Sequence, residues 1–230
     1  MPIYQRNDRH IHFIHIPKTG GSSIRTLLDD NGWIAKRSNI LPALRDQIRN
    51  NHNGILSDHI HRNVWKEWDQ NYEFQFSIIR NPYSRLESHL KQASYDLDLN
   101  NVEQLHHVQQ FFDEIVDSET VVTSDGNLTG GIGFSDNHWR PQVDFLGSNT
   151  FVYKLEEDID DLISDLKKRE VISDSCQLKH IRKGIKKFPG ELPWGNFLRT
   201  HQNFIEFYKS DFKLFEYKIL DSHELEKSKI

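Results

Sequence analysis

A lysine, two glycines and two serines stand together near the start of the chain, in the run from Pro17 to Ile24, which reads PKTGGSSI. Apolar residues typical of a strand precede this run and leucines at helical spacing follow it, so we expect a tight loop at the start of a helix. Such a helix N-terminus presents unpaired backbone N–H groups and a positive dipole end, which attract phosphate or sulfate. Lys18 adds a positive charge, and Ser22 and Ser23 add hydroxyl donors. The loop therefore predicts an anion-binding site, with an ordinary strand–turn–helix corner as the alternative.

Two further polar residues follow the next predicted strands. His59 comes just after the short predicted strand 55–57, and Arg80 comes directly after the run 74–79. The carboxyl ends of parallel strands lie at one edge of a sheet, where ligands bind. An imidazole titrates near neutral pH and suits proton transfer, whereas a guanidinium offers a planar fork for a phosphate. With the loop, these residues predict transfer of a group from a nucleotide that has two separate phosphate sites.

Alternating strand and helix patterns must position these residues. The predicted strands cover residues 11–16, 55–57, 74–79 and 150–153. One helix is expected after the first loop and another at Pro82 with Asn81 as its N-cap, and further helical patterns cover 156–169 and 196–211. This order indicates a single α/β domain over residues 1–230. We expect a three-layer, P-loop-like fold with a mainly parallel central sheet flanked by helices. The glycine-rich loop 118–137 has no assigned role.

Composition and charge exclude several classes of protein. The 230 residues are 36% hydrophobic and 27% charged, which fits one globular domain with a sizeable core. The net charge of -5 argues against a nucleic-acid binder. The single cysteine, Cys176, excludes an internal disulfide. The sequence shows no stretch of transmembrane length and no signal-peptide pattern, so we expect a cytoplasmic protein. It carries no signal for an oligomeric state.

Two segments resemble the nucleotide-binding motifs of sulfotransferases that use 3′-phosphoadenosine-5′-phosphosulfate (PAPS). PKTGGSSI is similar to their 5′-phosphosulfate loop, and IIRNPYSRLESHL at 78–90 is similar to their 3′-phosphate motif. HWRPQVDFL at 138–146, VYKLE at 152–156 and FYKSDFKLFEY at 207–217 are similar to later landmarks of the carbohydrate-type, heparan sulfate 2-O-sulfotransferase-like branch. The resemblance spans most of the chain. It implies transfer of a sulfuryl group from PAPS, as cosubstrate, to a hydroxyl of a carbohydrate or glycoconjugate.

The resemblance also implies roles for the residues that match these motifs. The 3′-phosphate would be held by Arg80 and Ser88, and His59 would be the catalytic base. The family often has glycine at the position of Asp58, so Asp58 either orients the imidazole or has no role in the site. Lys18 would also stabilise charge on the departing phosphate. The 5′-phosphosulfate would be held by six consecutive residues: Lys18, Thr19, Gly20, Gly21, Ser22 and Ser23. Acceptor contacts are expected from His61, His138, Arg140 and Gln142. For the last three of these residues, anchoring of the loop is the alternative.

Other chemistries fit parts of the sequence. The 13 histidines include two His-x-His pairs, at His10 and His59, which suit a metal, but no Cys, His and carboxylate set has a recognisable metal spacing. We therefore expect no metal. An ATP-dependent kinase of related architecture would show the order GxxxxGK[ST], which this loop lacks. A nucleotide-binding module without turnover would lack a base, whereas His59 supplies one.

Overall fold

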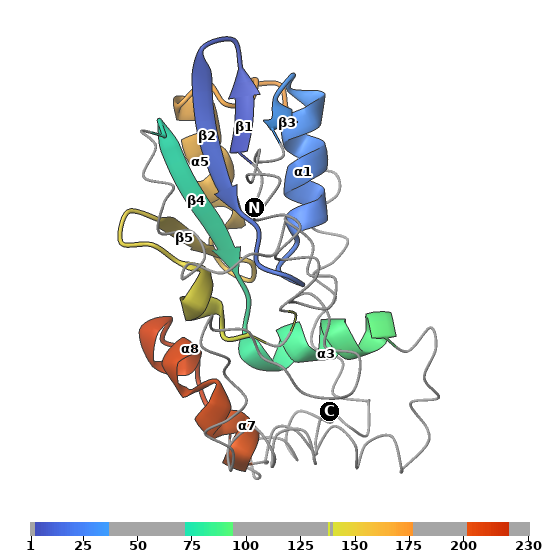
Figure 1. Ribbon diagram of the computed structural model, residues 1–230, viewed down its shortest axis with the longest axis vertical. Coiled ribbons are helices and arrows are strands. Elements are labelled where there is room, and N and C mark those ends of the chain that lie inside the picture. The colour runs from blue at the N-terminus through green and yellow to red at the C-terminus, as the bar shows by residue number, and fades with distance from the viewer. Residues whose placement is uncertain (1–2, 37–71, 94–137, 139, 177–201, 221–230) are drawn as a thin grey trace, which may run out of the picture.

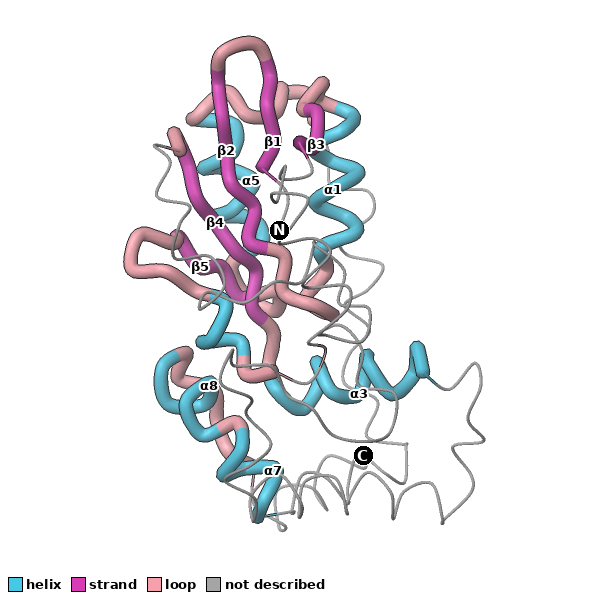
Figure 2. Tube along the Cα trace, viewed as in Figure 1, coloured by secondary structure: helices cyan, strands magenta, loops and turns pink. Residues whose placement is uncertain are grey.

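The computed structural model describes residues 3–36, 72–93, 138, 140–176 and 202–220. Within these ranges, strands and helices alternate over much of the chain (Figures 1 and 2). The strands are β1 (Ile3–Arg6), β2 (Arg9–Ile14), β3 (Ile34–Lys36), β4 (Phe74–Ile79) and β5 (Phe151–Lys154). The helices are α1 (Gly21–Asp30), α3 (Pro82–Ala93), the 3₁₀ helix η4 (Gln142–Phe145), α5 (Ile159–Lys168), α7 (Gln202–Phe207) and α8 (Lys209–Leu214). The protein is therefore of the mixed α/β class.

The described strands form one five-stranded sheet in the order β3-β1-β2-β4-β5. Strands β2, β4 and β5 are parallel, as expected, whereas β1 runs antiparallel to both β2 and β3. In the parallel part, Ile14 pairs with Ser77 and Ile79 pairs with Lys154. This register brings the carboxyl ends of β2, β4 and β5 to one edge of the sheet, so the loops that follow these strands start close together.

Side chains alternate between the two faces of the sheet and enter two hydrophobic clusters. Phe13, Phe76 and Ile78 pack with the apolar faces of α1 and α5. Ile14 and Ile79, which point the other way, pack with residues of α3, η4, α7 and α8. The predicted amphipathic helix at 156–169 is confirmed as α5, and the predicted docking of the C-terminal helical segment is confirmed for the described residues 202–214. Helices thus flank the sheet.

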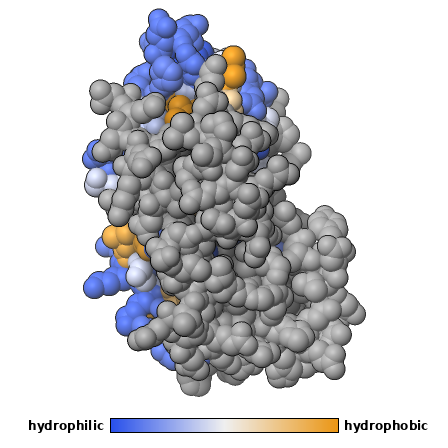
Figure 3. All heavy atoms as spheres, in the orientation of Figure 1, coloured by the Kyte–Doolittle hydropathy of each residue, from blue (hydrophilic) through white to orange (hydrophobic). Residues whose placement is uncertain are grey.

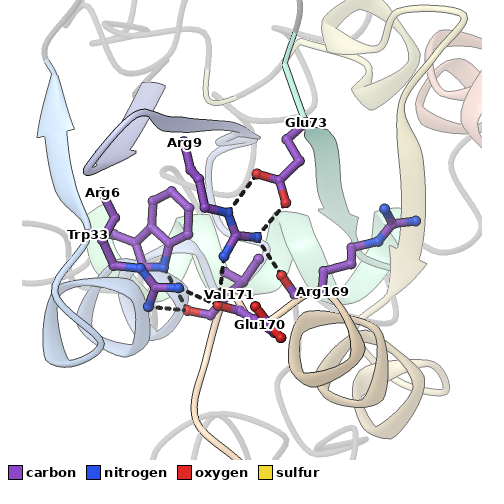
Figure 4. A network of polar contacts seen from close by, with 7 residues as sticks. All are labelled: Arg6, Arg9, Trp33, Glu73, Arg169, Glu170 and Val171. Carbon is purple, nitrogen blue, oxygen red and sulfur yellow. Dashed lines mark hydrogen bonds and ion pairs between the residues drawn. The ribbon is translucent and has the colours of Figure 1, made fainter.

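A network of arginines holds the end of the sheet that lies away from these loops (Figure 4). The Arg9 guanidinium bonds the Glu73 carboxylate and the backbone oxygens of Arg169 and Glu170, just beyond α5. Arg6 bonds the oxygens of Glu170 and Val171, and its guanidinium lies 4.6 Å from the Trp33 ring centroid. The network therefore ties the β1–β2 hairpin to the end of α5, and none of the predicted site residues that the structure describes takes part in it.

Exposed residues around the β1–β2 hairpin are hydrophilic, at the top of the view in Figure 3. In the part of the chain that the structure describes, no helix combines the length and the apolar character needed to cross a membrane.

Candidate functional site

The loop between β2 and α1 has an unusual backbone. Lys18 and Gly20 both have positive φ angles, 70° and 91°. Glycine adopts this conformation readily, but for lysine it is uncommon and is typical of functional loops. Thr19, between them, is fully buried, and its hydroxyl donates to the oxygen of Ile16 at 2.9 Å. The buried threonine holds the loop in one shape, with Lys18 half-buried at its turn.

Gly21, the first residue of α1, lies against the buried side chain of His15. An ideal Cβ at position 21 would stand 1.9 Å from both Cδ2 and Nε2 of the imidazole. The ring also stacks on Phe13, with 5.7 Å between the ring centroids. Only glycine at position 21 therefore allows the end of β2 to pack this closely on the start of α1.

The N-terminus of α1 is suited to an anion. Gly20 stands at the N-cap position, and in the described structure no side chain caps the first turn. That turn also contains no acidic residue within the described helix. Ser22 is exposed and Ser23 is half-buried. A helix of ten residues directs the positive end of its dipole and its first N–H groups toward the loop. The chemistry of this end therefore favours phosphate or sulfate.

Arg80 brings a second positive charge to the same loop. It follows β4 directly, and its Nη1 donates to the oxygen of Lys18 at 3.3 Å. The pKa of Lys18 is lowered, first by partial burial and then by the charge of Arg80. Two neighbouring cations each disfavour the charged form of the other, and an anion bound beside them stabilises both charged forms. The structure therefore joins two of the residues that the sequence predicted for the site.

The start of α3 is built as predicted. Asn81 is the N-cap, because its Oδ1 accepts the N–H of Tyr83 at 3.0 Å, and Pro82 is the first helical residue. Arg80 precedes the cap, so its side chain is held where the strand ends and the helix begins. Its Nε donates to Ser84 Oγ at 3.2 Å. Ser88, the other predicted 3′-phosphate ligand, is half-buried on the same helix.

Arg85 is a key residue of the site that the sequence reasoning left without a role. Its guanidinium is buried and donates to three backbone oxygens: those of Pro17 at 3.0 Å, Arg140 at 2.8 Å and His138 at 2.9 Å. It thereby joins the anion-binding loop to the segment before η4. Its spacing in the sequence could have pointed to this role. Arg85 stands three residues after Pro82 and four before His89, which places it on the inner face of α3.

Two of the predicted acceptor contacts have bracing roles in the structure. Gln142 is fully buried, and its amide accepts the N–H of Arg80 at 2.9 Å and donates to the oxygen of Arg80 at 2.8 Å. The same amide donates to the buried carboxylate of Asp211, at 3.2 Å. Arg140 is also buried and pairs with Asp144 at 2.9 Å. These contacts correspond to the anchoring alternative, because they hold Arg80 and its neighbours in place.

His138 pairs with a second histidine beside the loop. Its Nδ1 lies 2.9 Å from Nδ1 of His89, on α3, and the rings meet edge to face. The pKa of His89 is lowered to about 3, by burial and by the charges of Arg85 and Lys18. His89 is therefore neutral near pH 7, and one of the two rings donates its Nδ1–H to the other. The pair lies close enough to Lys18 to sense its charge.

The remaining predicted residues lie outside the described ones. These are the base His59, its neighbours Asp58 and His61, the second predicted strand and the loop 118–137. Among the residues that are described, no group of three or more His, Cys, Asp or Glu side chains could hold a metal ion.

Comparison with known proteins adds one finding. A family model described as the sulfotransferase family matches residues 2–188, which is well over half of the chain. This range includes the loop, α1, β4 and α3. No curated protein and no solved structure matches the chain.

Proposed function

The chain belongs to the sulfotransferase family, and we propose that it moves a sulfuryl group from PAPS to a hydroxyl of a carbohydrate or glycoconjugate. The observation that carries the proposal is the contact between Arg80 and Lys18 at the carboxyl edge of β2 and β4. It places two cations beside a helix N-terminus that is suited to an anion. We place the enzyme in the heparan sulfate 2-O-sulfotransferase-like branch and give it that branch's three-layer, P-loop-like fold.

The donor set fits a nucleotide with two anionic ends. Lys18 and the loop through Ser23 would hold the 5′-phosphosulfate, where the positive φ angles shape the loop and the start of α1 supplies backbone N–H groups. Arg80 and Ser88 would hold the 3′-phosphate, to which a guanidinium can donate two parallel hydrogen bonds. The pKa of Lys18 is lowered, first by burial and then by the charge of Arg80, and a bound anion would counter both effects by stabilising the charged lysine.

The proposed mechanism is in-line displacement. PAPS supplies a sulfuryl group on a phosphate that leaves readily. His59 accepts the proton of the acceptor hydroxyl, whose oxygen bonds to sulfur as the bond from sulfur to the phosphate oxygen breaks. Lys18 and the loop N–H groups stabilise the negative charge that grows on that oxygen. Adenosine 3′,5′-bisphosphate is the second product. Catalysis of this kind depends on positioning and electrostatics, as in phosphoryl transfer.

Acceptor contacts are proposed for His61 and His138. The position of His138 supports its role. The Arg85 guanidinium donates to the backbone oxygens of both His138 and Pro17, so His138 lies beside the loop. Gln142 and Arg140 would act on the acceptor through the shape of the site, given their burial and internal bonds.

A transfer assay tests the proposal. Sulfur-labelled PAPS is incubated with the protein and a panel of glycans, glycolipids and simple alcohols, and label is sought in the acceptor. We expect transfer to a carbohydrate and loss of at least about a hundredfold in turnover for His59→Ala, the scale of general-base catalysis. Near-normal turnover by a folded His59→Ala variant would refute its role as base. Turnover with ATP in place of PAPS would instead support the kinase alternative.

A further inference from the structure

The guanidinium of Arg80 is held at two of its nitrogens. Nε donates to Ser84 Oγ at 3.2 Å, and Nη1 donates to the oxygen of Lys18 at 3.3 Å. A guanidinium is planar, so two anchored nitrogens and the side-chain stem together define the direction of its fork. Bidentate recognition of a phosphate depends on that direction. The residues that anchor Arg80 are therefore candidates for control over which nucleotide binds.

Ser84 can accept from Arg80 because its own proton is used elsewhere. Its hydroxyl lies 3.1 Å from the oxygen of Asn81 and 3.2 Å from Oε1 of Glu156. Neither of those oxygens can donate, so the serine donates to one of them and keeps a lone pair for Nε of Arg80. Ser84 is buried, which limits the other orientations that its hydroxyl can take.

Glu156 stands in the loop that follows β5 and reaches the start of α3. Its Oε1 also accepts the N–H of Asn81 at 3.0 Å, and its Oε2 accepts the hydroxyl of Tyr217 at 3.1 Å. Tyr217 is buried, and its pKa is raised by burial and by the charge of Glu156. The carboxylate is therefore anchored from the C-terminal part of the chain while it holds the N-cap residue and the serine.

We propose that Ser84 and Glu156 are positioning residues that set the guanidinium of Arg80 for a 3′-phosphate and so make the site selective for 3′-phosphorylated nucleotides. The inference deepens the proposed function and rests on it, since it assumes that Arg80 binds the 3′-phosphate. Without the serine acceptor, Nε of Arg80 loses a partner and the side chain gains rotamers that must be frozen when the nucleotide binds.

Calorimetry with the full chain tests the inference through a ratio of affinities. Adenosine 3′,5′-bisphosphate and adenosine 5′-monophosphate differ only in the 3′-phosphate, so the Kd of the monophosphate divided by the Kd of the bisphosphate isolates recognition of that group. We expect Ser84→Ala and Glu156→Ala each to reduce this ratio about tenfold, the value of one hydrogen bond to a charged group. Glu156→Gln should retain most of it, because the glutamine oxygen can accept from Ser84 while its NH₂ group donates to Tyr217.

Glu157→Ala is the matched control, because Glu157 is an exposed glutamate like its neighbour Glu156 but its carboxylate pairs with Lys154, at 3.3 Å. It should leave the ratio unchanged. An unchanged ratio in folded Ser84→Ala and Glu156→Ala would overturn the inference. Equal loss of affinity for both nucleotides would overturn it too, because that is the effect of a purely structural role. A wild-type protein that does not distinguish the two nucleotides would instead refute the 3′-phosphate site of the proposed function.

Discussion

The imidazole of His15 occupies the space that a side chain at Gly21 would need, with an ideal Cβ only 1.9 Å from Nε2 of the ring. His15 directly follows β2 and Gly21 begins α1, so this contact sets the distance between the strand and the helix on either side of the anion-binding loop. It explains in steric terms why the second glycine of the loop is required, whereas the first is required by its positive φ angle.

Gly21→Ala is expected to damage both stability and binding. Overpacking of a buried site typically costs about 1–3 kcal/mol, and displacement of His15 would distort the loop. Thermal melts and calorimetry with adenosine 3′,5′-bisphosphate measure the two effects. The matched control is Gly147→Ala, whose Cβ would meet its nearest neighbour, Gln75, at an ordinary 3.4 Å. Equal melting temperatures for the wild-type protein and Gly21→Ala would contradict the steric explanation.

Arg85→Met should be strongly destabilising. Methionine fills similar volume but leaves the backbone oxygens of Pro17, Arg140 and His138 without their donor. Each buried acceptor that is left without its donor costs about 1–3 kcal/mol. Urea denaturation measures the change, and Lys213→Met on the exposed side of α8 serves as a surface control. A change below about 0.5 kcal/mol, the scale of surface substitutions, would show that Arg85 does not hold the loop.

His12 should make stability depend on pH. It is buried, and burial lowers its pKa to about 4. An unfolded histidine titrates near pH 6.5, so the unfolded chain binds more protons between about pH 6.5 and 4. The contribution of His12 to the free energy of unfolding is therefore fully present above about pH 6.5 and is lower by about 2 kcal/mol at pH 5.

Urea denaturation of the wild-type protein and His12→Asn between about pH 7.5 and pH 5 measures this effect. The variant should lose less stability than the wild-type protein as the pH falls. His89, whose pKa is lowered to about 3, acts in the same direction but is present in both proteins. Parallel curves for the two proteins would show that His12 does not carry the effect.

Local signals predicted much of the fold. The pair Asn81 and Pro82 correctly placed the start of α3, because capping depends on neighbours in sequence. The strands β1 and β3 were not predicted. They have four and three residues, too few to show a period, and they form through pairing with each other and with β2. Their antiparallel direction is the main difference from the expected sheet.

For the site, residue types identified the charged anion ligands but not the residues that hold those ligands in place. Lys18 and Arg80 were predicted as separate anion ligands, and the structure places them in contact. The roles of Ser84 and Glu156 depend on contacts between distant segments, which no spacing in the sequence reveals. For Arg85, spacing indicates the inner face of α3 but not the backbone oxygens that it binds. For Gln142 the sequence left two roles open, contact with the acceptor and anchoring of the loop. Its burial against Asp211 is a property of the folded chain.

Nucleotide preference tests the central claim most directly, because it does not depend on the unidentified acceptor. Thermal melts are recorded with adenosine 3′,5′-bisphosphate and with ATP at the same concentration, set at about a hundred times the Kd of the bisphosphate. Binding at that concentration adds about 2.7 kcal/mol to the free energy of unfolding, which raises the melting temperature of a chain of this size by roughly 5–10 °C. We predict this stabilisation with adenosine 3′,5′-bisphosphate, much less with ATP at equal concentration, and its loss in Lys18→Ala. A preference for ATP, or no response to either nucleotide, would contradict the assignment of this site to PAPS-dependent sulfuryl transfer.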